Sequence, residues 1–100
     1  MSGIKRFALM VDEALGLTTV YWMRSGDRMC LHVRREGVQA EEARAIASDI
    51  AADMGCADAR SGAFMHVDGN GEMEGVGVAE MPWSPRVESE LSRRGFAEVR

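Results

Sequence analysis

The sequence has few cysteines and no long run of apolar residues, and both shortages exclude whole classes of protein. Two cysteines, Cys30 and Cys56, are too few for a small scaffold held by disulfides, so we expect free thiols in a reducing compartment. The longest apolar run covers residues 7–11, far short of a membrane span. Asp12 and Glu13 interrupt the apolar stretch near the start, so a secretory signal is not expected. The sequence therefore predicts a cytoplasmic protein that does not engage a membrane.

The ligand spacing of known metal sites is also missing. Cys30, His32, Cys56 and His66 are the residue types that bind zinc. They do not occur in the C-x-x-C or H-x-x-x-H pairs of zinc modules, and Cys56 follows a predicted helix. We predict no cofactor and no metal. An enzyme or metalloprotein built on Cys30, His32 and His66 is kept as a third hypothesis.

The segment DGNGEMEG, residues 68–75, resembles the start of a calcium loop but fails its register. An EF-hand requires Gly at its sixth place and Glu at its twelfth, where this chain has Met73 and Ala79. The glycines here also lack the Gly-Lys-Ser/Thr of a P-loop and the strand-to-helix position of a dinucleotide fingerprint. A glycine-rich hairpin turn accounts for the whole segment.

No pair of side chains has the spacing of a catalytic couple. Cys30 and His32 share one side of a predicted strand, about 7 Å apart, which is too far for a hydrogen-bonded nucleophile and base. Glu72 and Glu74 could share a strand face, but on a small open sheet without a pocket they are expected to be solvated. We predict that the chain is not an enzyme.

The amino-acid composition is that of an ordinary folded protein. Of its 100 residues, 46% are hydrophobic and 28% are charged, a balance that argues against disorder. A chain of this length has room for one hydrophobic core. The sequence predicts one compact domain over residues 1–100.

The first segment is ambiguous between a helix and a strand. Apolar side chains recur every three or four positions in residues 3–15, which favours a helix that begins after Ser2 and ends at Gly16. The apolar run at 7–11 is also compatible with a buried strand. We predict the helix and keep the strand as the alternative.

A hairpin follows. Residues 18–24 are rich in β-branched and aromatic side chains, and residues 25–27 have the composition of a turn. In residues 28–35 Met29, Leu31 and Val33 alternate with polar side chains. This alternation predicts a hairpin with one apolar face.

The second half predicts a helix, a second hairpin and a short helix. Residues 39–54 carry the clearest helical stripe of apolar side chains and end at a glycine. Strands are expected at 60–68 and 72–81, joined by the glycine-rich turn. A short helix with a Ser-Pro start occupies residues 84–95, and 96–100 form a tail.

These elements predict an α+β two-layer sandwich. Its sheet would be mostly antiparallel and four-stranded, with hairpin–helix–hairpin topology and flanking helices. Gly75 and Gly77 are expected to mark a bulge or a sheet edge, and the tail to pair at an edge. Because a second copy could pair with either edge, a homodimer is also considered.

Charge is unevenly distributed along the chain, whose net charge is −4. Residues 21–35 are basic, whereas residues 36–81 are acidic and are expected to present carboxylates on the outer side of the long helix and on the second hairpin. Such a surface can dock on a basic groove, including one meant for nucleic acid. The candidate protein-binding residues are Glu42, Asp49, Asp53, Glu72 and Glu74.

In size, acidity and lack of catalytic motifs the chain is similar to small inhibitors encoded by phages and mobile elements, such as anti-CRISPR proteins and nucleic-acid mimics. This similarity is general, because no residue pattern identifies a family. The leading prediction is a non-enzymatic protein-binding module, an inhibitor or adaptor. It would dock sterically on a larger protein or complex with a basic, nucleic-acid-handling surface.

The alternative prediction uses the basic hairpin. If the apolar side of that hairpin faces a helix, its other side presents arginines beside aromatic rings, and Phe64 and His66 could add to them. Arginines interleaved with aromatics are how sheet surfaces bind RNA or single-stranded DNA. The candidate nucleic-acid-binding residues are Trp22, Arg28, His32 and Arg34.

Overall fold

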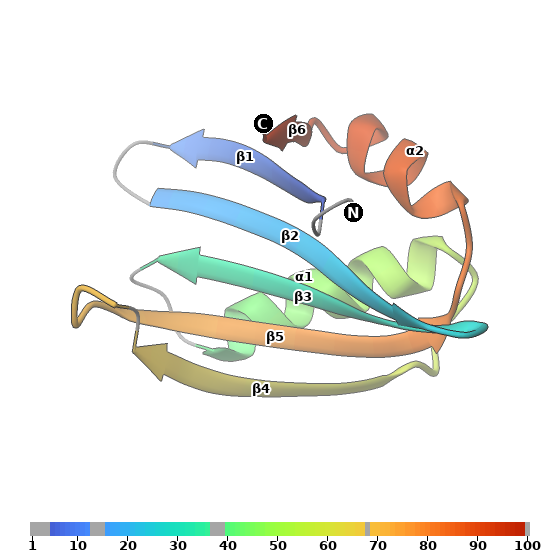
Figure 1. Cartoon of the computed structure of the whole chain (residues 1–100), viewed down its shortest axis with the longest axis horizontal. Coiled ribbons are helices and arrows are strands. Elements are labelled where there is room, and N and C mark those ends of the chain that lie inside the picture. Colours follow the sequence, from blue (N-terminus) through green and yellow to red (C-terminus); the bar gives the residue numbers. More distant parts are fainter. Residues whose placement is uncertain (1–4, 13–15, 37–39, 68, 100) are drawn as a thin grey trace.

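The computed structural model describes residues 5–12, 16–36, 40–67 and 69–99, which form one six-stranded antiparallel sheet and two helices (Figure 1). The strands lie side by side in the order β4-β5-β3-β2-β1-β6. Neither helix is long and apolar enough to cross a membrane. The elements, in chain order, are β1 (Arg6–Asp12), β2 (Gly16–Ser25), β3 (Arg28–Glu36), α1 (Ala40–Asp53), β4 (Arg60–Val67), β5 (Met73–Pro82), α2 (Arg86–Arg93) and β6 (Ala97–Val99).

The β2–β3 hairpin forms as the sequence predicts. Ser25 pairs with Arg28, so Gly26 and Asp27 make a two-residue turn. Gly26 has a φ of 62°, and glycine at the first central position is what a type II′ hairpin turn requires. The odd-numbered side chains of β3 from 29 to 33 are buried, which confirms the predicted alternation.

Helix α1 packs closely on the sheet because most of the side chains at the contact are small: alanines on the helix and glycine on β5. Its buried side chains are three alanines and Ile50. On the sheet, a Cβ atom at Gly77 would lie 2.2 Å from the Arg44 backbone nitrogen and 2.3 Å from the Ala43 carbonyl carbon. Only glycine fits between β5 and α1 at this position.

Gly77 therefore has a different role from the predicted one. Strand β5 lies between β4 and β3, and its register with both neighbours is regular across Gly75 and Gly77. The prediction of a bulge or an edge at these glycines is wrong, because the close approach of α1 explains Gly77.

Helix α2 begins and ends with the signals that the sequence contains. The Ser84 hydroxyl accepts a hydrogen bond from the Arg86 backbone N–H at 3.2 Å. Gly95 has a φ of 95°, and the following Phe96 N–H donates to the Leu91 carbonyl at 3.0 Å, as in a Schellman motif. Both Phe96 and Leu91 belong to the core, so this end also anchors the helix.

The predicted helix over residues 3–15 is wrong in the part of it that the structure describes. Residues 6–12 form β1, which pairs with β2 and β6, and Gly16 begins β2. The proposed cap Ser2, with residues 3, 4 and 13–15, lies outside the described residues. Ala8 occupies the strand face opposite to Phe7 and Leu9, so β1 is apolar on both faces and its sequence lacks strand alternation.

The α+β class is confirmed, whereas the four-stranded sheet is wrong in detail. Strand β1 replaces the predicted helix, and the tail adds β6, which pairs with β1 as an edge strand. Side chains of α1, α2 and one face of the sheet form one hydrophobic core. Both helices therefore lie on the same side of the sheet, as α1 does behind β3 and β5 in Figure 1.

Candidate functional site

The described helices both pack on one side of the sheet and leave its other side uncovered, and we call this uncovered side the open sheet face. Strand alternation and register assign its side chains, because directly opposed residues of antiparallel strands share a face. It includes Arg6, Leu17, Thr19, Tyr21, Met23, Arg28, Cys30, His32, Arg34, Arg60, Gly62, Phe64, His66, Glu74, Val76, Val78, Glu80 and Val99.

The centre of the open sheet face is an aromatic pair. Tyr21 and His32 are opposed across β2 and β3, and their rings stack with centroids 4.8 Å apart and 9° between planes. The imidazole Nδ1 lies 3.2 Å from the Cys30 carbonyl oxygen. Val78 is opposite His32 on the other side, so the pair sits in a half-buried apolar setting. The centre is thus a rigid surface with one polar edge.

Large apolar side chains are also exposed on this face. Met23 on β2 is 54% exposed, and Phe64 on β4 is 49% exposed. Met23 is on the same strand as Tyr21, two residues further along, whereas Phe64 is on the edge strand β4, and Val99 is exposed at the opposite edge. Three of the six exposed large apolar side chains in the described part of the chain therefore project from this face, beside its charged side chains, and such side chains are available for contact with a partner.

Charged side chains occupy two ends of the open sheet face. At one end Arg34 is paired with Glu74, and His66 Nε2 lies 4.0 Å from the same carboxylate. At the other end Glu80 is opposite both Arg60 and Cys30. The described part of this face carries four arginines and two glutamates, so it is basic although the whole chain is acidic.

Two hollows lie along this face. One of about 230 Å³ is lined only by open-face side chains, among them Arg6, Tyr21 and Arg34. A second, of about 490 Å³, lies at the β2–β3 turn and is lined in part by Met23 and Cys30. Each is large enough to accept a side chain of a partner, which is how anchor residues bind at interfaces.

The acidic residues that the sequence singled out do not form one surface. Glu42, Asp49 and Asp53 are exposed on the outer side of α1, as predicted. Glu72 lies near the β4–β5 turn, and Glu74 is on the open sheet face, across the sheet from α1. The prediction missed this separation because it placed the second hairpin and the helix without knowing which face each side chain would take.

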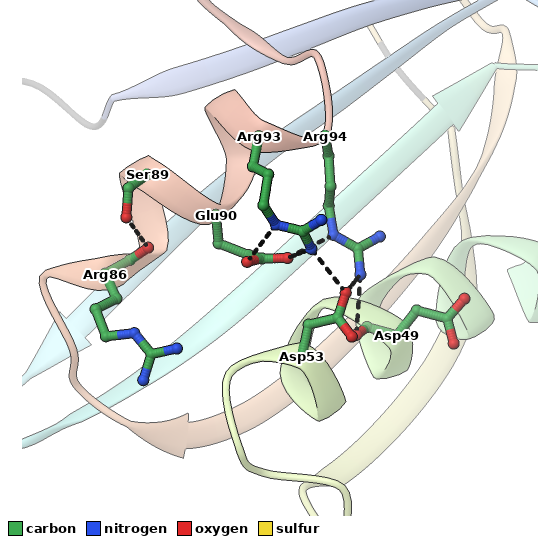
Figure 2. A network of polar contacts seen from close by, with 7 residues as sticks. All are labelled: Asp49, Asp53, Arg86, Ser89, Glu90, Arg93 and Arg94. Carbon is green, nitrogen blue, oxygen red and sulfur yellow. Dashed lines mark hydrogen bonds and ion pairs between the residues drawn. The ribbon is translucent and has the colours of Figure 1, made fainter.

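The acids of α1 are also partly neutralised within the chain. Asp53 is paired with Arg93 and Arg94, which reach across from the end of α2 (Figure 2). Glu42 lies 3.9 Å from the Arg35 guanidinium. Asp49 accepts from Arg94 only through its backbone carbonyl, at 3.1 Å, and its carboxylate points away in Figure 2.

Glu90 is the centre of the network that joins the two helices. It accepts hydrogen bonds from Arg93 Nε at 3.2 Å and from Arg94 Nε at 3.0 Å. The hydrogen bond from Arg93 and the contacts with Arg94 lower the pKa of Glu90 to about 2, although burial of the carboxylate opposes the shift. This network holds α2 against α1, so these charges have a structural task.

The four residues of the predicted nucleic-acid site also divide between the two faces. Arg28, His32 and Arg34 lie on the open sheet face, as their alternation predicts. Trp22 is opposite Leu31 on the covered face, where its ring stacks on Phe7 with centroids 5.7 Å apart. The placement of Trp22 with the other three is therefore wrong, because it has the parity of the core residues.

The thiol and imidazole candidates do not form a catalytic or metal cluster. Cys30, His32 and His66 are on the open sheet face, but β5 separates His66 from the other two. Burial and the nearby Glu80 raise the pKa of Cys30, which disfavours its thiolate. Within the described ranges, no three His, Cys, Asp or Glu side chains lie close enough to hold a metal ion.

Sequence reasoning missed Tyr21 and Met23 as members of the open sheet face. A signal for both was present, because the two-residue turn between Ser25 and Arg28 fixes the register of the hairpin. Counting back from that turn places Tyr21 opposite His32 and Met23 opposite Cys30.

Comparison of the chain with protein-family models, with curated proteins and with solved structures finds no match.

Proposed function

We propose that this chain is a non-enzymatic protein-binding module that docks through its open sheet face, as an inhibitor or an adaptor. The observation that carries the proposal is the arrangement of this face. A stacked Tyr21–His32 pair lies at its centre, exposed Met23 lies on the same strand as Tyr21, exposed Phe64 lies on β4, and arginines lie at both ends.

The residue types on the two sides of the molecule favour this face over the acidic side of α1. Cores of protein interfaces are enriched in Tyr, Phe, Met and Arg, and depleted in Glu, Asp, Ser and Ala. The open sheet face has the enriched types. The exposed side chains of α1 are Glu41, Glu42, Ala45, Asp49, Ala52 and Asp53, which are all of the depleted types.

The chemistry of this face specifies its partner. Its two hollows and its exposed apolar side chains fit a partner with one or two apolar anchors. Arginines outnumber glutamates on the face, so carboxylates around the partner's apolar patch complement it. The proposed partner is therefore an apolar protein surface bordered by acidic side chains.

The proposed mechanism is occupation of a surface, without turnover. The sheet has six strands and is backed by α1, so the open sheet face is presented on a stable scaffold rather than on loops. Binding of a preformed face loses little conformational entropy. A partner surface covered in this way is no longer available to its other ligands, which is how a small module inhibits a larger protein.

The test compares two double variants in a pull-down, one altered on the open sheet face and one altered on α1. The open-face variant combines Met23→Asp with Arg28→Glu, both exposed and remote from the core. The matched control combines Glu42→Lys with Asp49→Lys on α1, which leaves the Asp53 network intact. Proteins captured from a lysate of the native host are quantified by mass spectrometry, and binding of single-stranded RNA and DNA is measured by gel retardation.

The proposal expects one protein that the unaltered chain and the α1 control retain equally. Capture of this protein falls at least about tenfold with the open-face variant, as for loss of an interface hot spot. A partner lost only with the α1 variant would move the site to the acidic helix. Retardation of oligonucleotides that Arg28→Glu abolishes, without a protein partner, would replace the proposal with the nucleic-acid alternative.

A further inference from the structure

The outer edge of the sheet at β4 is unusually open to pairing. Strand β4 is eight residues long and is the last strand on its side of the sheet. An edge strand presents a row of backbone N–H and C=O groups, which proteins protect with short length, lysine, proline or a bulge. Strand β4 has no lysine or proline, and its register with β5 is regular.

Strand β4 exposes apolar side chains on both faces, in addition to Arg60 and His66 on the open sheet face. Phe64 projects from the open sheet face, whereas Met65 and Val67 project from the other face, where they are 43% and 56% exposed. Met73, which is opposite Val67 on β5, is also exposed. Most of the exposed large apolar side chains in the described part of the chain therefore lie on this one hairpin.

The opposite edge of the sheet does not share these properties. Strand β6 has three residues, Ala97–Val99, and the middle one is Glu98. A strand this short with a central charge is a poor template for pairing. The two edges are thus unequal, and the apolar one is β4.

The sequence of β4 is complementary to itself in the antiparallel direction. Its first half after Arg60 is small, Ser61-Gly62-Ala63, and its second half is large, Met65-His66-Val67. If two copies pair antiparallel with Phe64 opposite Phe64, each residue lies opposite the residue that is equally far from position 64 on the other side. Phe64 then faces Phe64 of the second copy, and each of the three large side chains after it faces a small one: Met65 faces Ala63, His66 faces Gly62 and Val67 faces Ser61.

Charge and packing agree with this register. In this register no two side chains of like charge lie opposite each other, because Arg60 lies outside the paired positions 61–67. Helix α1 lies mainly over β5 and so is set back from the edge. Directly opposed residues share a face, so Phe64 meets its own symmetry mate on the open sheet face.

We propose that two copies of this chain pair antiparallel through β4, about a twofold axis at Phe64, to form one continuous twelve-stranded sheet. The two open sheet faces then lie on the same side of the dimer, and both helical layers lie on the other. This inference does not depend on the proposed function.

The first test measures the oligomeric state of the full purified chain by sedimentation velocity over a range of concentrations. The edge variant Met65→Lys places a charge in the pairing strand. The control Met23→Lys makes the same change at a comparably exposed methionine on the interior strand β2. We expect a dimer for the unaltered chain and the control, and a dissociation constant at least about tenfold higher for Met65→Lys.

The second test locates the axis by disulfide cross-linking in a Cys30→Ala, Cys56→Ala background. Phe64→Cys places two thiols on opposed residues, about 5 Å apart between Cβ atoms, within reach of a disulfide. Val67→Cys places an exposed thiol about 20 Å from its symmetry mate. Mild oxidation should give a covalent dimer with Phe64→Cys and not with Val67→Cys, and this readout does not depend on the folding of Met65→Lys.

A monomer at every concentration would overturn the proposal. A dimer that Met23→Lys disrupts and Met65→Lys leaves unchanged would also overturn it, because the open sheet face would then be the interface. Equal cross-linking at positions 64 and 67 would reject the register about Phe64.

Discussion

The two faces of the sheet differ sharply in the side chains that they carry, although the same strands form both. The same strands β2, β3 and β5 supply both faces, with alternate residues going to each. The covered face is mostly apolar and includes the aromatic rings of Phe7 and the half-buried Trp22, and its side chains are small where α1 approaches, with glycine at position 77. The open sheet face combines aromatic rings, methionine and paired charges. Folding thus constrains one half of these residues and leaves the other half free to be selected for binding.

Methionines on the two faces should give the largest contrast in stability. Met81 is 0% exposed on the covered face, whereas Met23 is more than half exposed on the other. Met81→Ala leaves a cavity and is expected to lower the free energy of unfolding by roughly 2–5 kcal/mol, whereas Met23→Ala should change it by less than about 0.5 kcal/mol. Urea denaturation of both variants measures the difference, and similar losses in the two would contradict the assignment of faces.

Glycines on the two faces should respond to alanine with opposite signs. Gly77→Ala forces a Cβ into the backbone of α1 and is expected to cost about 3 kcal/mol, at the upper end for overpacking. At Gly62 on the open sheet face a Cβ makes only an ordinary 3.6 Å contact with Val78. Gly62→Ala should therefore stabilise the fold by about 0.4–1 kcal/mol, through the entropy of the unfolded chain. An unchanged or raised urea midpoint for Gly77→Ala would contradict the close packing of α1 on Gly77, and a lowered midpoint for Gly62→Ala would contradict the space at Gly62.

Among the charged side chains on the helical side, Glu90 should have the largest effect on the free energy of unfolding. Glu90→Gln removes the acceptor shared by Arg93 and Arg94 and is expected to cost about 1–2 kcal/mol at neutral pH, since solvent screens the exposed Arg93. Glu88→Gln is the control, because its ion pair with Lys5 is exposed and contributes little.

The effect of Glu90 should also depend on pH in one direction. The folded-state pKa is about 2 and lies below the ordinary carboxyl value of 4.5, so the stabilisation is present above pH 4.5 and is lost as the pH falls towards 2. The urea midpoints of the unaltered chain and of Glu90→Gln should therefore converge in strong acid. Midpoints that stay equally far apart down to pH 2 would mean that the difference has another origin.

The smallest effect is expected on the outer side of α1. Glu42→Lys with Asp49→Lys should change the free energy of unfolding by less than about 0.5 kcal/mol, because Glu42 has only a 3.9 Å contact with Arg35 and both carboxylates are exposed. Partner binding should also be unchanged. A large loss of binding with normal stability would make this side, rather than the open sheet face, the functional one.

Much of the sheet could be predicted from local pattern. The alternation in β3, the turn at Gly26 and the glycine that ends each helix are signals that depend on neighbouring residues only. They give both hairpins and both helices within a few residues of their observed bounds. On the open sheet face, the alternation correctly assigns Arg28, His32 and Arg34.

What could not be predicted depends on contacts that are distant in the sequence. Strand β1 is apolar on both faces, so its period does not distinguish it from a helix, and only pairing with β2 and β6 decides. The interior position of β5 follows from its pairing with β3, which no local signal announces. The pairing of Asp53 with two arginines some forty positions away likewise removed it from a free acidic surface.

The pairing of β1 with β6 also places the first and the last strand of the chain side by side. Arg6 is opposite Val99, so the two ends of the described chain meet at one edge of the sheet, and β4 forms the other edge. A chain in which a short linker joins these ends, and which is reopened at an exposed turn such as 26–27, keeps every strand neighbour. Such circular permutants offer new termini close to the open sheet face, where reporters of binding can be attached without touching the β4 edge.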